Sequence, residues 1–123
     1  DVERLLGDAG IVRHRGKIEA TINNAQKICD LIDREGSFAK FVWGYEPQDD
    51  TNNEQSSEED VKTRVTRDEA KRFAKDLKKL GFKFFGPTTA YAFMQAMGMV
   101  NDHVGTCPQW QICHDLRQSF KRP

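Results

Sequence analysis

The chain has 123 residues, which suits one small domain or part of a larger protein. Hydrophobic residues make up 37% and charged residues 31%, with a formal net charge of zero, so a modest core can form. No apolar run reaches the roughly 18 residues that a membrane-spanning helix needs, and the first residues lack the basic-then-apolar pattern of a signal peptide. We therefore expect no membrane partner.

The three cysteines, Cys29, Cys107 and Cys113, are odd in number and widely spaced. A secreted disulfide framework uses an even number of cysteines in a short chain, so the sequence favours a reducing, cytoplasmic location. The chain also starts without a methionine and inside a helical pattern. We expect it to be a trimmed or internal fragment.

Acidic residues are concentrated in one part of the chain. Residues 46–60 hold seven acidic groups and no basic one, which leaves 12 acidic against 19 basic side chains elsewhere. A basic folded part with an acidic loop is compatible with a nucleic-acid partner. An ordinary solvated surface explains the same excess of charge.

Apolar side chains recur at helical spacing and predict an all-α fold. The expected helices cover residues 1–8, 17–35, 38–43, 67–80 and 87–97, with a further helical turn near 112–120. Gly36 and Gly98 stand where helices end, Ser37 can cap the short third helix, and Pro87 suits a first helical position.

Two sequence features mark the middle of the chain. Residues 47–60 are polar and acidic without an apolar face, which predicts an exposed, flexible loop. The segment Thr66-Arg67-Asp68-Glu69 has the pattern of a capping box and predicts a helix start near residue 67.

A glycine-bounded turn joins the two helices expected between residues 67 and 98. In a helix-hairpin-helix, backbone N–H groups at the start of the second helix bind a DNA phosphate without reading sequence. The segment from Gly81 to Pro87 fits that outline, except that Phe84 stands where the usual hairpin has a glycine. An ordinary αα-hairpin, with phenylalanines filling the core, explains the same pattern.

The pair His103 and Cys107 has the spacing of two metal ligands. Imidazole and thiolate suit tetrahedral zinc, which needs four ligands in a structural site. Cys113 and His114 are near in sequence, but adjacent ligands close strained rings. A surface histidine and an inert cysteine are the alternative.

Other polar residues give weaker signals. The basic cluster Arg13–Lys17 can contact phosphate or remain solvated. Among the carboxylates, Asp102 stands out because it follows the second helix of the hairpin. No nucleophile arrangement is supported, and no catalytic residue is identified.

Five segments of the chain are characteristic when taken together: Asp8–Ile18, Phe41–Trp43, Leu77–Gly86, Tyr91–Ala96 and Val100–Cys107. Together they closely resemble the DNA-3-methyladenine glycosylase I family. The resemblance covers nearly the whole chain, and its motifs occur in the family's order and at its spacing. It would place the chain in the C-terminal two-thirds of such an enzyme.

The resemblance implies an all-α, helix-hairpin-helix DNA glycosylase fold, incomplete at the N-terminus, in which residues 1–123 form one domain fragment. It implies base-excision repair of alkylated double-stranded DNA: the enzyme flips the nucleotide and hydrolyses the N-glycosidic bond of 3-methyladenine. The DNA-binding residues implied are Phe82, Lys83, Phe84, Phe85 and Gly86.

The resemblance also implies one structural zinc per complete protein, with His103 and Cys107 as two of its ligands. The other two ligands, the base-binding glutamate and most pocket aromatics belong to the family's N-terminal segment, which this sequence lacks. We therefore expect weak or no excision by this fragment, a zinc site that can be empty, and self-association through the exposed seam. A non-catalytic helix-hairpin-helix module that only binds DNA, or a purely structural helical domain, are the alternatives.

Overall fold

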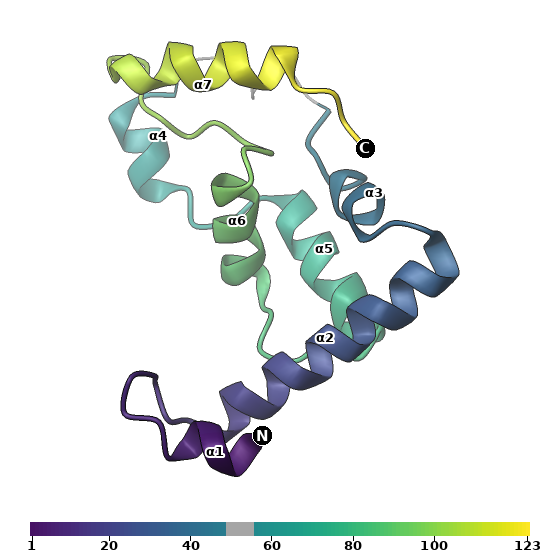
Figure 1. Cartoon of the computed structure of the whole chain (residues 1–123). Coiled ribbons are helices and arrows are strands. Elements are labelled where there is room, and N and C mark those ends of the chain that lie inside the picture. Colours follow the sequence, from purple (N-terminus) through teal and green to yellow (C-terminus); the bar gives the residue numbers. More distant parts are fainter. Residues whose placement is uncertain (49–55) are drawn as a thin grey trace.

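The computed structural model describes residues 1–48 and 56–123, which confirm the all-α prediction (Figure 1). One isolated bridge, Ser56 with Val104, is the β pairing found in the described residues. No helix in these two ranges is long and apolar enough to cross a membrane. The helices are α1 (Val2–Leu6), α2 (Arg15–Glu35), α3 (Phe38–Trp43), α4 (Glu58–Thr63), α5 (Asp68–Lys79), α6 (Pro87–Ala96) and α7 (Pro108–Ser119).

The core lies between α5 and α6. Ala70, Ala74 and Ala90 are buried there, and their small side chains let the two helices approach closely. Phe73 is fully buried in this core, and its ring lies 4.8 Å from the ring of Tyr45 between centroids. In Figure 1, α2 runs past the hairpin end of α5 and α6, and α7 lies across the opposite end.

The ends of α2 and α3 follow local rules. Helix α2 begins at Arg15, earlier than the apolar pattern predicts, because the His14 ring accepts a hydrogen bond from the Lys17 N–H at 3.2 Å. It ends at Gly36, whose φ of 80° favours glycine. Ser37 caps α3 by accepting from the Lys40 N–H, as predicted.

The predicted loop 47–60 is wrong at both of its ends. Pro47 is buried, and residues 58–60 form the first turn of α4, while residues 49–55 lie outside the described residues. Helix α4 has six residues, too short for a periodic apolar face to appear in the sequence. Its start is fixed by a capping box instead: Ser57 accepts from the Asp60 N–H, and Asp60 accepts from the Ser57 N–H.

The capping box predicted at Thr66–Glu69 does not form. Helix α5 starts at Asp68, so Arg67 is the capping residue and no side chain caps this end. Thr66 lies one residue too early to accept a bond from the first turn, and its hydroxyl points to the Arg67 carbonyl at 3.4 Å.

Helix α7 is much longer than the single turn predicted near 112–120. Its sequence pattern is weak because long-range ion pairs hold it in place. Glu46 is buried and accepts hydrogen bonds from Arg117 at 3.0 Å and from Arg122 at 2.8 Å. Burial alone would raise the pKa of Glu46, but the bonds from Arg122 and Arg117 outweigh it and lower the pKa.

A second carboxylate, Asp102, connects α6 to the segment before α5. One carboxylate oxygen accepts from Tyr91 and from Gln95, the latter at 2.8 Å; the other accepts from Arg64 at 2.9 Å and lies 3.6 Å from Arg67. Its side chain is only 9% exposed. Burial would raise the pKa of Asp102, but these donors outweigh it and lower the pKa.

The replacement Asp102→Asn should lower the free energy of unfolding at pH 7 by about 1–3 kcal/mol, since bonds from charged donors are lost in a buried place. Because the folded-state pKa is depressed, this stability is present above the unfolded value of about 3.9 and is lost as the pH falls through the folded-state pKa. The difference between the two proteins in urea unfolding should therefore narrow as the pH falls below about 4.

The matched control is Asp68→Asn, because Asp68 is 91% exposed and bonded to Lys71 at 2.8 Å. It should change the free energy of unfolding far less than Asp102→Asn does, because solvent screens this exposed ion pair. Equal losses for the two variants at pH 7 would contradict the central role of Asp102.

Candidate functional site

The turn between α5 and α6 is anchored from inside by two phenylalanines. Phe82 is 8% exposed and belongs to the buried core, and the ring of Phe85 lies 5.3 Å from that of Phe73 between centroids. Helix α5 is closed by bonds from the Gly81 N–H to the Lys78 carbonyl and from the Phe82 N–H to the Leu77 carbonyl. Gly81 has a φ of 88°, which explains the glycine at this position.

The outer side of the turn is polar backbone and exposed side chains. Lys83 and Gly86 are exposed, and Phe84 is 64% exposed although aromatic. Gly86 precedes α6, Pro87 occupies its first turn, and no side chain caps this end. Across the described residues, the N–H groups of Phe84, Gly86 and Thr88 find no hydrogen-bond acceptor. Free donors and the positive end of a ten-residue helix therefore face solvent together.

Phe84 adopts a φ of 55°, in the left-handed region that glycine prefers. This is the position where the sequence departs from the usual hairpin, so the backbone keeps the glycine-like conformation without the glycine. Its ring meets the edge of the His14 ring at 6.1 Å between centroids. The basic segment Arg13–Lys17 thus lies next to the turn.

The five residues predicted to bind DNA therefore divide into two groups. Lys83, Phe84 and Gly86 are exposed at the outer side of the turn, where a phosphate could reach them. Phe82 and Phe85 point into the core and support the turn from behind. The sequence alone could not separate the two groups, because three of the five residues are phenylalanine.

His103 and Cys107 lie between α6 and α7. His103 is exposed, and its Nδ1 lies 3.1 Å from the Asn101 side-chain oxygen, which leaves Nε2 toward solvent. Asn101 is buried and donates to the Trp110 carbonyl at 3.0 Å, so it is fixed by α7. Cys107 is the residue that precedes α7, and it is partly exposed.

A local completion of this pair is not seen. The His114 ring is stacked on Trp110 at 4.9 Å between centroids. Within residues 1–48 and 56–123, no group of three or more His, Cys, Asp or Glu side chains could hold a metal ion. His103 and Cys107 supply suitable nitrogen and sulfur donors, but only two of the four that a structural zinc takes.

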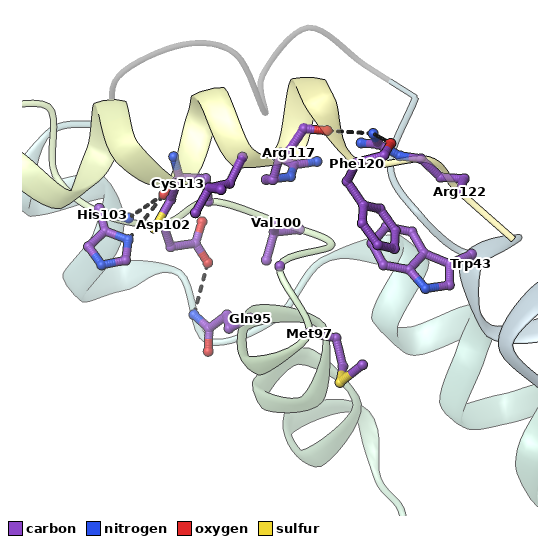
Figure 2. Close-up of a pocket in the computed structure, with 13 residues that line it drawn as sticks. Trp43, Gln95, Met97, Val100, Asp102, His103, Cys113, Arg117, Phe120 and Arg122 are labelled. Atoms are coloured by element: carbon purple, nitrogen blue, oxygen red, sulfur yellow. Dashed lines mark hydrogen bonds between the residues drawn. The ribbon is translucent and has the colours of Figure 1, made fainter.

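A pocket of about 480 Å³ lies between the end of α6 and α7 (Figure 2). Its walls are mainly apolar, and Gln95, Asp102 and His103 lie at one end while Trp43 and Phe120 pack together at the other. Asp102 is not free to act as a base here, because donors occupy both of its oxygens. Sequence reasoning missed this pocket, since it depends on Glu46 binding Arg117 and Arg122, which lie 71 and 76 residues away.

Comparisons with known proteins agree with one another. The family model described as methyladenine glycosylase matches residues 1–110. DNA-3-methyladenine glycosylase 1 of Escherichia coli (strain K12) is 44% identical over 107 residues, which cover 87% of this chain and 56% of that protein. DNA-3-methyladenine glycosylase of Haemophilus influenzae is 36% identical over 108 residues, covering 88% of this chain and 57% of the relative.

Solved structures give the same result. A crystal structure of 3-methyladenine DNA glycosylase I has a TM-score of 0.75 at 43% identity, over 87% of this chain and 58% of the other. A 3-methyladenine DNA glycosylase I from Staphylococcus aureus has a TM-score of 0.74 at 36% identity, over 87% and 56%. The chain spans little more than half the length of the curated relatives that it matches. The chain belongs to the methyladenine glycosylase family.

Proposed function

We propose that this chain forms the DNA-binding part of a DNA-3-methyladenine glycosylase, a base-excision repair enzyme that hydrolyses the N-glycosidic bond of 3-methyladenine in alkylated duplex DNA. The family match over residues 1–110 supports it most strongly. The relatives share this activity in their names, and one structural neighbour was solved with 3-methyladenine bound.

The α5–α6 turn fits a helix-hairpin-helix that holds one DNA phosphate. The unpaired N–H groups of Phe84, Gly86 and Thr88 can donate to phosphate oxygens, and the N-terminus of α6 favours the negative charge. Lys83 adds a positive charge at the same edge. These contacts carry no base information, which suits an enzyme that must meet its lesion in any sequence.

Removal of 3-methyladenine requires little acid catalysis from the protein. The methylated base is already cationic and leaves readily, so the enzyme must flip the nucleotide, select the base and stabilise the sugar cation. Asp102 is fully engaged by Tyr91, Gln95 and Arg64, so we assign it a structural role rather than that of the stabilising carboxylate. We propose that sequence outside these 123 residues completes the base pocket.

The chain alone should bind duplex DNA and release little 3-methyladenine compared with a full-length relative. The measurement is base release from methylated DNA beside binding to the same duplex. Lys83→Ala should weaken DNA binding. It should also reduce by about one the steepness with which the logarithm of the binding constant falls with the logarithm of salt concentration. Lys40→Ala, at an exposed position of α3, is the charge-matched control and should leave both the affinity and its salt dependence unchanged.

Base release at the rate of a full-length relative would contradict the incomplete pocket. A longer natural protein that binds DNA and never releases base would favour the non-catalytic module instead. No affinity for duplex DNA would overturn the proposed function altogether.

We also propose that His103 and Cys107 are two ligands of a structural zinc, completed from outside this chain. Asn101 supports this assignment, because it engages Nδ1 of His103 and leaves Nε2 for a metal. When bound, zinc would tie the segment before α7 to the part of the protein that supplies the other ligands.

Calorimetric titration of the reduced chain with zinc chloride should show weak binding that Cys107→Ala abolishes, since a thiolate is lost. Cys113→Ala is the matched control and should bind zinc as the unmodified chain does. Equal loss in both variants would instead indicate a local site that includes Cys113.

We further propose a cytoplasmic protein, supported by three free thiols, and self-association of the isolated chain. Ile112 and Leu116 on α7 are 51% and 64% exposed, and Phe120, which directly follows the helix, is 45% exposed. Leu116→Glu should shift the sedimentation coefficient toward that of a monomer, because a charge enters this apolar surface. Val65→Glu, at a site 69% exposed elsewhere, should not. Sedimentation of the unmodified chain as a monomer would contradict the proposal of self-association.

A further inference from the structure

Two consecutive asparagines of α2 bind the backbone of the α5–α6 turn. Asn24 donates to the Lys83 carbonyl at 2.8 Å and accepts from the Lys83 N–H at 2.8 Å, so one side-chain amide engages both polar groups of one residue. Asn23 donates to the Gly81 carbonyl at 2.9 Å. Asn23 and Gly81 lie 58 residues apart in the chain, and Asn24 and Lys83 lie 59 residues apart.

The bond to the Lys83 carbonyl has a directional consequence. That carbonyl and the Phe84 N–H belong to the same planar peptide group, and no cis peptide bond occurs in the described residues. In a trans peptide the C=O and N–H point in opposite directions. Because Asn24 holds the carbonyl toward α2, the Phe84 N–H must point away from α2, toward solvent.

Little else holds this peptide group in place. Phe84 has a φ of 55°, which a non-glycine residue adopts only when its surroundings impose it. Its side chain is 64% exposed, so burial does not impose it, and the ring contact with His14 is an edge contact on the surface. Asn24 donates one bond to Lys83 and accepts another from it, so the residue that precedes Phe84 is held on both of its polar groups.

We propose that Asn24 is a positioning residue for DNA binding: it orients the Phe84 N–H as a phosphate donor without touching DNA. This inference rests on the proposed function of the turn. Making both bonds to Lys83 takes a side chain that donates and accepts, as an amide does. Alanine offers neither bond, and an ionised aspartate can accept from the Lys83 N–H but cannot donate to the Lys83 carbonyl.

The test compares Asn24→Ala with Asn23→Ala in the 123-residue chain, using an undamaged duplex as the probe. Asn24→Ala should weaken binding by about tenfold, the scale of one lost hydrogen bond to a charged group. Asn23→Ala is matched in residue type and helix. The peptide that Asn23 holds carries the Phe82 N–H, which is bonded to Leu77. Asn23 also donates to the Asn24 side-chain oxygen at 3.1 Å, but its removal leaves both bonds between Asn24 and Lys83 in place. Asn23→Ala should therefore weaken DNA binding far less than Asn24→Ala.

Amide hydrogen exchange separates orientation from unfolding. In Asn24→Ala, exchange of the Lys83 amide should accelerate while the core amides of Leu77 and Met94 keep their protection. Equal DNA affinity of Asn24→Ala and the unmodified chain would overturn the inference and leave the proposed function standing. Equal weakening by both variants, or loss of core protection, would reduce Asn24 to a structural role. No binding of the duplex by the unmodified chain would overturn both the proposed function and this inference.

Discussion

The close contact between α5 and α6 is the constraint on which the candidate site depends. Small side chains at Ala70, Ala74 and Ala90 bring the helices together, and Phe73 fills the space beside them. Their separation fixes how tight the connecting turn must be. Phe82 and Phe85 then point inward, and the backbone between and after them faces solvent. The packing of α5 against α6 therefore determines which backbone N–H groups of the turn are available at the surface.

Much of this arrangement could be predicted from the sequence, because it is governed by local rules. Helical spacing identified α2, α5 and α6. Gly36 marked the end of α2, Ser37 the start of α3 and Pro87 the start of α6. The turn between α5 and α6 was also predicted, whereas the role of His103 and Cys107 as metal ligands stays a prediction. Helix α4 was missed because a capping box, rather than an apolar face, stabilises six residues.

What could not be predicted depends on polar contacts over long distances. Glu46 looked like one of many solvated acids, yet it is buried against two arginines of the C-terminal segment, and this pairing places α7 and creates the pocket. Asn24 looked like an ordinary surface residue of α2, yet it binds the turn. Neither partner is near in sequence, and charge or amide chemistry alone does not specify a partner.

The segment from Asn101 to His103 has a mechanical consequence for assembly. Asn101 is bonded to α7, and its neighbour Asp102 is bonded to α6 and to Arg64, so two consecutive residues are anchored to different elements. His103 therefore extends from a support that resists displacement in more than one direction. A metal ion bound at His103 would therefore meet a ligand whose backbone position is already fixed before the metal arrives.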